Sequence, residues 1–285
     1  MKFSKLGLVL AVGMVMTVLS ALATGAAQAE ENKGPLWIVG SPARGLLAGQ
    51  TRAFDATSGV AELHSSASGV PNTVCEKTLA RGFLLGGSPG TDDATITFRG
   101  CHAAGKPNCV ATGVAAGTNE EEIVVSVLTI LAFANGSRTS AVDLYAPEGE
   151  SGAEELFVAY KLKNRSGFTE CGTLAGEIKA EAKGSPVTIN GKTRNLGQLA
   201  KIGHEASGVF TLSTVGETAN VGLLEFPERN GSEHFNEAEL YNSSSGKYEK
   251  VTALLEAGAL KEAWQTTTTP AVILLSPKEP FGWDY

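Results

Sequence analysis

Hydrophobic and polar residues alternate along most of the chain with the period of two that is typical of β-strands. Gly, Asn, Ser and Pro separate these runs, and they are the residues that end strands and form turns. The pattern predicts strands at residues 91–98, 123–133, 141–145, 156–162, 208–214, 220–226 and 271–275. Together they favour an all-β fold, either an antiparallel sandwich or barrel-like sheets.

Two parts of the pattern depart from simple alternation. The long, mainly apolar run at 123–133 does not alternate, which predicts a strand buried on both faces. Segments 194–202 and 251–264 are helix candidates, so the fold contains at most one or two short helices. The second segment reads equally well as a strand pair broken at Gly258. The pairs Asn135-Gly136 and Asn190-Gly191 predict two-residue hairpin turns.

The first 29 residues have the order of a secretory signal peptide. Lys2 and Lys5 precede an uncharged run at 6–22, and Ala27-Gln28-Ala29 supplies a cleavage site before Glu30. The alternative is an uncleaved membrane anchor, but the run is at the short edge for a membrane span. We therefore expect a protein that is secreted or associated with the cell envelope.

Charge and hydropathy narrow the possible partners. The net charge is −7, and it becomes −9 once Lys2 and Lys5 are removed with the signal peptide. Such a chain is not expected to bind nucleic acid, because nucleic-acid binding relies on basic side chains at phosphates. No second apolar run approaches 18 residues, so no integral membrane span is expected in the mature chain.

The mature chain is predicted to have two regions. Residues 30–183 contain all four cysteines and form a disulfide-containing β domain. Residues 184–285 form a second β region, either separate from the first or continuous with it. The boundary between the two regions is placed at the polar, turn-rich segment 184–195.

The four cysteines are an even number in a chain expected to be exported, which predicts two disulfides. Cys101 and Cys109 flank a loop that contains Gly and Pro, and the segments on either side resemble the two arms of a hairpin. A bridge across the neck of that hairpin joins Cys101 to Cys109, and elimination then joins Cys75 to Cys171. Zinc is not predicted, because there is no C-x-x-C and only His102 lies near a cysteine in sequence.

A series of short motifs carries a resemblance that extends to about residue 180. These are Leu36-Trp37, Ala48-Gly49-Gln50, Val74-Cys75, Gly87-Ser88-Pro89-Gly90-Thr91, Phe98-Arg99-Gly100-Cys101, Cys109 and Cys171. In this order they resemble a group of uncharacterised secreted β-rich proteins of soil actinobacteria. The resemblance implies export and an all-β fold, and it implies no activity.

Two short motifs match hydrolase patterns by spacing alone. Residues 86–90 match G-x-S-x-G, but Pro89 follows Ser88 and has no N–H to offer to an oxyanion hole. The following segment reads as a strand where the motif needs a helix, so a turn is expected. Residues 244–247 match S-x-x-K, but they lie in a predicted turn rather than on a helix.

Candidate metal and cofactor sites are equally sparse. Asp92 and Asp93 offer oxygen ligands for Ca²⁺, but no recognised Ca²⁺ loop surrounds them. None of the histidines forms H-x-x-x-H or H-E-x-x-H, and no Walker loop or G-x-G-x-x-G follows a strand. The sequence therefore predicts no catalytic residue, no metal and no cofactor.

These observations favour a secreted, non-catalytic β protein with a binding or structural role and an unknown partner. The first alternative is a secreted glycan-directed hydrolase with two carboxylates in a groove. The second is a small-ligand carrier with an apolar cavity inside a barrel.

Overall fold

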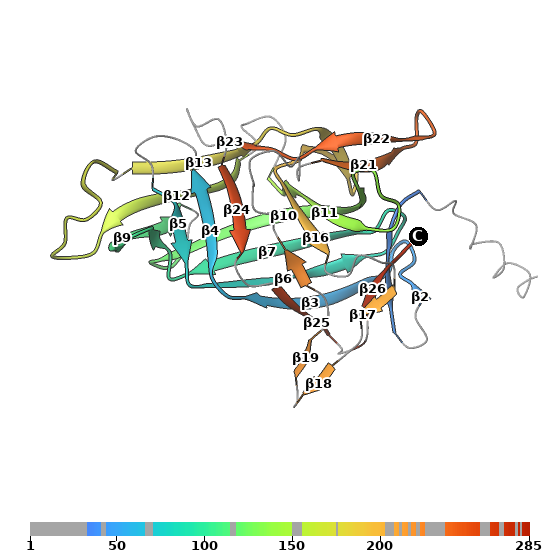
Figure 1. Cartoon of the computed structure of the whole chain (residues 1–285), viewed down its shortest axis with the longest axis horizontal. Helices are drawn as coiled ribbons and strands as arrows, with labels where there is room; N and C mark the ends of the chain where they lie inside the picture. Colours follow the sequence, from blue (N-terminus) through green and yellow to red (C-terminus); the bar gives the residue numbers. More distant parts are fainter. Residues whose placement is uncertain are drawn as a thin grey trace, which may run out of the picture. The chain divides into compact units, whose positions relative to one another are not determined.

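A computed structural model describes residues 33–40, 44–65, 71–114, 118–149, 156–174, 176–202, 208–210, 213–215, 218–220, 223–225, 237–256, 263–267, 271–276, 279 and 281–285. Apart from one short 3-10 turn, η1 (Gly172–Leu174), every regular element in these ranges is a β-strand. The strands pair in antiparallel sheets (Figure 1). The predicted all-β fold is therefore confirmed.

Ten strands form the larger sheet, which curls on itself. In order across the sheet they are β11 (Ala141–Pro147), β16 (Gln198–Ile202), β20 (Leu223–Glu225), β25 (Ala271–Ser276), β3 (Thr51–Ser58), β6 (Lys77–Leu85), β7 (Thr91–Arg99), β10 (Glu122–Ala134), β21 (Glu237–Asn242) and β22 (Lys247–Thr252). The first strand of this order, β11, also pairs with β10. The eight strands from β11 to β10 thus form a closed series of pairings, called the strand ring below.

The remaining strands form a second large sheet and three small ones. The eight-stranded sheet has the order β23 (Leu255–Glu256), β13 (Gly176–Ala182), β12 (Leu156–Asn164), β9 (Lys106–Gly113), β8 (His102–Ala103), β5 (Thr73–Cys75), β4 (Ala61–Ser65) and β24 (Ala263–Thr267). A four-stranded sheet has the order β17 (Gly208–Phe210), β26 (Phe281–Asp284), β1 (Leu36–Val39) and β2 (Arg44–Gly45). Two hairpins are β14 (Pro186–Ile189) with β15 (Lys192–Asn195), and β18 (Ser213–Val215) with β19 (Thr218–Asn220).

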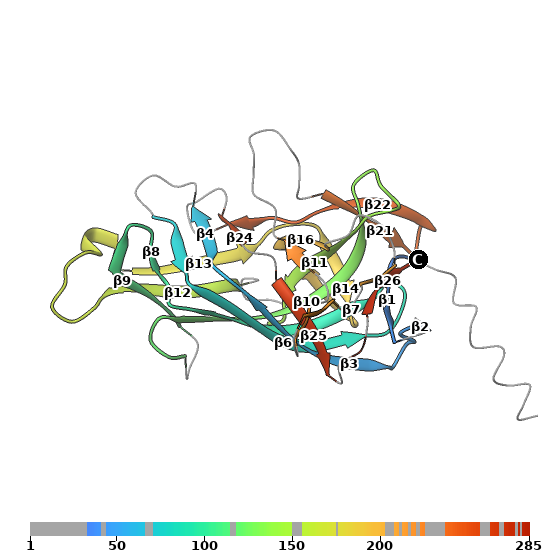
Figure 2. The same cartoon turned by 60° about the horizontal axis from the view of Figure 1, so that its bottom comes forward.

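The long strands β7 and β10 pass through two environments. At one end, around Phe98 and Ile123, they face β4, β5 and β12 of the eight-stranded sheet across a shared apolar core (Figures 1 and 2). At the other end β10 turns back into β11 and the sheet curls into the ring. The molecule therefore has a sandwich half and a ring half, and it combines the two predicted architectures.

Strand β10 shows why the run at 123–133 does not alternate. Residues 127–133 are all buried. One face, which includes Val127 and Leu131, belongs to the core that the two large sheets share. The opposite face, with Leu128 and Ile130, packs in a second cluster with Ile189 of the hairpin β14–β15. The prediction of a strand buried on both faces is confirmed for residues 127–133, whereas Val124 is half-buried and Ser126 is exposed.

The Asn-Gly turns lie where the pattern predicts them. Asn190 and Gly191 join β14 to β15 with φ of 51° and 76°, the positive values of a two-residue hairpin turn. Gly136, with φ of 74°, also lies in a turn, between β10 and β11, but Phe133 pairs with Ala141, so this connection is longer than the predicted two-residue hairpin turn. The polar segment 184–195 is therefore a hairpin rather than a linker.

Both helix candidates are wrong. Segment 194–202 contains the end of β15 and all of β16, and β16 is paired with β11. Segment 251–264 contains the end of β22, then β23, then the start of β24, while residues 257–262 lie outside the described ranges. Pairing with neighbouring strands overrides a weak helical pattern in both places.

The two predicted regions share their sheets. Strands β16, β20 and β25 belong to the same strand ring as β3, β6 and β7, and residues 33–285 form one compact unit. The predicted signal peptide at 1–29 lies outside the described residues. Within the described ranges, no helix has the length and apolarity needed to cross a membrane.

All four cysteines form disulfides, but the predicted pairing is wrong. The bonds are Cys75–Cys101 and Cys109–Cys171. The segments that resembled two arms of one hairpin belong to different sheets, because β7 pairs with β6 and β10 whereas β9 pairs with β8 and β12. The chain leaves the ten-stranded sheet at Gly100, whose φ is 65°.

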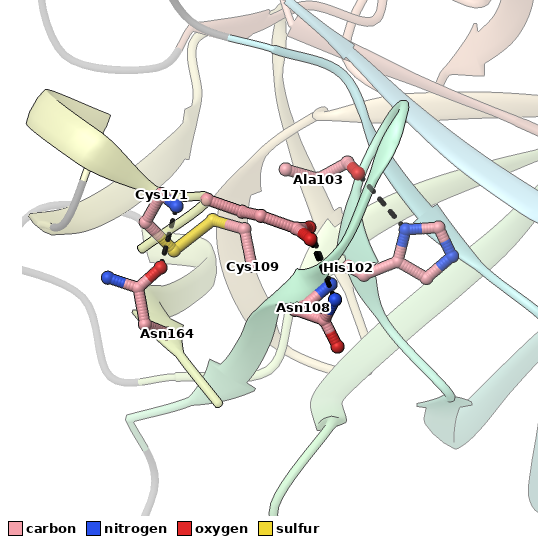
Figure 3. Close-up of a disulfide and its surroundings, with 7 residues drawn as sticks. His102, Ala103, Asn108, Cys109, Asn164 and Cys171 are labelled. Carbon is pink, nitrogen blue, oxygen red and sulfur yellow. Dashed lines mark hydrogen bonds between the residues drawn. A yellow bond between two sulfur atoms is a disulfide. The ribbon is translucent and has the colours of Figure 1, made fainter. Parts of the chain in front are cut away.

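The register explains both bonds. Val74 on β5 lies opposite His102 on β8, so the next residues, Cys75 and Cys101, also meet across the two strands. For the second bond, the backbone N–H of Cys171 donates to Asn164 Oδ1 at 2.7 Å, which folds the chain after β12 back toward Cys109 (Figure 3). Both disulfides therefore lie in the eight-stranded sheet and its loops.

Candidate functional site

A row of polar side chains crosses the inner face of the strand ring. Asp92 on β7 lies opposite Thr129 on β10, and Thr129 lies opposite Tyr145 on β11. Tyr145 in turn lies opposite Gln198 on β16. Directly opposite residues of antiparallel strands point to the same face of a sheet. Asp143 lies two residues before Tyr145 and shares that face. These five residues are called the acidic row.

The acidic row is sealed from solvent. Asp92 is 4% exposed and Asp143 is 1% exposed, and Thr129, Tyr145 and Gln198 are also buried. Carboxyl groups are rarely buried to this extent without a positive partner. Within the described ranges neither carboxyl forms an ion pair, and Thr129 Oγ1 and Asp143 Oδ1 have no hydrogen-bond partner. Polar groups in this state are either strained or complete only with something further bound.

Burial dominates the ionisation of the row. It raises the pKa of Asp143 to about 7, although the Thr129 and Tyr145 hydroxyls favour the ionised form. Burial and then repulsion by Asp143 hold the pKa of Asp92 well above its usual range. Burial and the nearby Asp143 charge raise the pKa of the Tyr145 hydroxyl, which donates to Asp143. Burial thus shifts both carboxyls of the row toward their protonated forms.

The indole of Trp37 packs against the strand ring beside the acidic row. The Trp37 Nε1–H donates to the Thr91 carbonyl at 3.2 Å. A Cβ placed on Gly90 would lie 2.8 Å from Trp37 Cδ1 and 3.0 Å from Leu131 Cδ1, so glycine allows the indole to approach this closely. Leu131 lies opposite Asp143. Trp37 therefore lies over the ring at the level of the two carboxyls.

The sequence suggested joint chelation of Ca²⁺ by Asp92 and Asp93, and the strand geometry argues against it. Neighbouring residues of a strand point to opposite faces. Asp92 faces the inside of the ring, whereas Asp93 Oδ1 accepts a hydrogen bond from the Phe83 backbone N–H at 3.2 Å. In the part of the chain that the structure describes, no three His, Cys, Asp or Glu side chains form a group that could hold a metal ion.

Sequence reasoning missed Asp143, the second carboxyl of the row. The sequence did contain a sign of this carboxyl, because Asp143 interrupts a segment at 141–147 that is otherwise free of charge. Every residue of that segment is buried. An acidic residue inside an otherwise apolar strand indicates a buried carboxyl, but its partner in the row, Asp92, lies 51 residues earlier in the chain on another strand.

The other motifs singled out in the sequence have structural roles. Ser88 lies in the turn between β6 and β7, where its Oγ accepts from the Lys33 N–H at 2.9 Å and donates to the Gly34 carbonyl at 3.1 Å. Residues 244–247 form the turn between β21 and β22. His102 Nδ1 lies 3.0 Å from the Ala103 carbonyl (Figure 3). His204 and His234 lie outside the described residues.

A second group of side chains, the tyrosine–arginine cluster, lies where β21 and β22 extend the sheet. The Arg138 guanidinium lies 3.5 Å from the centre of the Tyr248 ring, and it also bonds to Glu239 at 2.9 Å. Tyr241 contacts Tyr248 edge to face at 5.3 Å between ring centres. Because these groups pair with one another, the cluster stabilises the hairpin by cation–π and aromatic contacts.

One apolar cavity lies between the sheets of the sandwich half. Its volume is about 30 Å³. It is lined by Ala61, Glu62, Leu63, Thr73, Cys75, Phe98, Ile123, Val125, Phe157, Val158 and Leu255. That space suits one or two water molecules, whereas small-molecule pockets measure roughly 300–1,000 Å³.

Comparison of the chain with protein-family models, with curated proteins and with solved structures gave no match.

Proposed function

We propose that this protein is exported and acts outside the cytoplasm as a non-catalytic β protein with a binding or structural role. The observation that carries the proposal is the burial of the carboxyl pair in the acidic row. Asp92 and Asp143 lie on the inner face of the ring beneath Trp37, where neither a substrate nor a water nucleophile has access. Two disulfides fit an oxidising compartment.

The two alternatives differ in what they require of this structure. A glycan-directed hydrolase would use Asp92 and Asp143 as its acid and base, and a carboxyl with a raised pKa suits the acid. That role requires the ring to open to a saccharide. A small-ligand carrier would use the apolar cavity, which at about 30 Å³ requires the two sheets of the sandwich half to move apart.

Hydrolysis by the secreted protein is the direct test. We expect the wild-type protein to release no more reducing ends from a panel of soluble polysaccharides than Asp92→Asn and Asp143→Asn do. Release that occurs with the wild type and disappears in both variants would establish the hydrolase instead. A binding role is tested on the same panel by affinity electrophoresis.

Export has its own test. Protein recovered from culture medium should begin at Glu30, as measured by intact mass. A full-length chain in the membrane fraction would contradict export by a cleaved signal peptide.

A further inference from the structure

The acidic row supports an inference that is independent of the proposed role. We propose that Asp92 and Asp143 together hold at least one proton inside the folded ring at neutral pH, so that the stability of the fold decreases as the pH rises from about 5 to 8. The pair thus makes the stability of the strand ring sensitive to pH.

The geometry places the two carboxyls in one apolar compartment. They lie on β7 and β11, the two strands that flank β10, and Thr129 of β10 lies between them. Leu84 is opposite Asp92 on β6, Leu131 is opposite Asp143 on β10, and both leucines are buried. Two ionised carboxylates here would repel each other without water to screen them.

The groups that face the pair supply no compensating positive charge in the described part of the ring. Arg52 on β3 lies in the same cross-strand row, two strands from Asp92, but its Nε donates to Glu279 at 2.6 Å. The other charged group that acts on Asp92 is Asp93, which is also negative. The remaining facing groups are neutral and come from β1, β6, β10, β11 and β16: Trp37, Leu84, Thr129, Leu131, Tyr145 and Gln198.

The hydrogen bonding of the row points the same way. Asp143 Oδ1 and the Thr129 hydroxyl are buried without a hydrogen bond of good geometry. An ionised carboxylate only accepts hydrogen bonds, whereas a protonated carboxyl also donates one, and a threonine hydroxyl can donate or accept. A proton on the pair therefore adds a donor to a set in which Asp143 Oδ1 lacks one.

The direction of the pH effect follows from the pKa values. The pKa of Asp143 is raised by burial from 3.8 to about 7 in the folded chain, and that of Asp92 is raised well above its usual range. The folded state therefore binds more protons than the unfolded state. The stabilisation is complete below the unfolded pKa and is lost as the pH rises through the folded pKa.

Unfolding in urea at pH 5, 6, 7 and 8, with EDTA present, tests the proposal on the wild-type protein. One extra bound proton changes the unfolding equilibrium constant tenfold per pH unit, so we expect it to rise about a hundredfold between pH 5 and pH 7. Glu120, Glu170 and Glu249, whose pKa values are lowered from 4.5 in the folded chain, change stability in the opposite direction and mainly below pH 5. A stability that is constant or rises over this interval overturns the proposal.

Asparagine variants assign the effect to the pair. Asp143→Asn keeps the shape of the side chain and removes its ionisation, so it should make the pH profile less steep and unfold less readily than the wild type at pH 8, while buried Asp92 still holds a proton. Asp93→Asn, its matched control on the outer face of β7, should retain the wild-type slope. An unchanged slope in both Asp143→Asn and Asp92→Asn overturns the proposal.

Two further measurements keep the proposal falsifiable even if the asparagine variants fail to fold. The infrared band of a protonated carboxyl should be present in the wild-type protein at pH 7 and should disappear above the folded pKa values. Its absence at pH 7 overturns the proposal. Stabilisation of the EDTA-treated protein by added Ca²⁺ at pH 8 would assign the pair to a cation rather than to a proton and would also overturn it.

Discussion

The long strands β7 and β10 run through both halves of the molecule, yet the two halves are stabilised by different means. In the sandwich half, β5 has three residues and β8 has two, and the disulfide Cys75–Cys101 joins them. In the ring half, β10 has 13 residues and pairs with β7 and β11 on its two sides. Short strands share few backbone hydrogen bonds, so a covalent link contributes most where pairing contributes least.

The halves also differ in how they bury polar groups. In the sandwich half the Thr73 and Tyr160 hydroxyls bond to each other at 3.0 Å, and burial raises the pKa of Tyr160 to about 12. In the ring half, the acidic row leaves Asp143 Oδ1 and Thr129 Oγ1 without partners. The Thr73–Tyr160 hydrogen bond satisfies both buried hydroxyls and adds rigidity, whereas the missing hydrogen bonds of the acidic row make the ring half sensitive to a bound proton.

The largest expected effect is the loss of the Cys109–Cys171 bond. Replacing both cysteines by alanine frees a loop with a sequence separation of 62, which should lower the free energy of unfolding by about 4 kcal/mol in the chain-entropy model. Replacing Cys75 and Cys101, with a separation of 26, should cost about 3.5 kcal/mol. Urea unfolding without reductant measures both, and the reverse order would show that loop entropy does not rank the two bonds.

Removal of apolar volume from the ring half should cost nearly as much. Leu131, on the inner face of β10, is fully buried beside Gly90, so Leu131→Ala should lower the free energy of unfolding by about 3 kcal/mol. Leu47→Ala is the matched control, because Leu47 is 50% exposed, and it should cost under about 0.5 kcal/mol. Equal losses in the two variants would mean that the ring is not tightly packed.

A smaller effect is expected at the buried hydroxyl pair of the sandwich half. Thr73→Val leaves the Tyr160 hydroxyl without its partner, which should cost about 1–2 kcal/mol. Thr188→Val removes an exposed hydroxyl that bonds to Thr193 at 3.1 Å, and water replaces that bond. If thermal unfolding gives the same shift for both variants, the buried pair contributes no more than a surface one.

The smallest change in the free energy of unfolding is expected for an ion pair on the surface of the strand ring. Arg81 and Asp55 form an ion pair at 2.9 Å between β6 and β3, but their side chains are 86% and 60% exposed. Arg81→Ala should change the free energy of unfolding by less than about 0.5 kcal/mol, and even less at high salt. A larger loss would show that β3 and β6 depend on this contact for their register.

Local sequence determined the strands and several turns of this protein. Alternation at 91–98 and the mainly apolar run at 123–133 correspond to β7 and β10 because side-chain period and burial are properties of the strand itself. Asn190-Gly191 predicted its hairpin because two positive φ values are needed within two residues. The helix candidates failed where the pattern was weak and strand partners from elsewhere in the chain decided the conformation.

The tertiary structure decided the pairing of distant elements. The bonds Cys75–Cys101 and Cys109–Cys171 depend on which sheet each segment joins, and the change of sheet at Gly100 leaves no periodic signal in the sequence. Asp92 and Asp143 meet because β10 has β7 on one side and β11 on the other. Composition and alternation could show that an aspartate is buried, but only the closed order of strands brings the two carboxyls together and separates them from water.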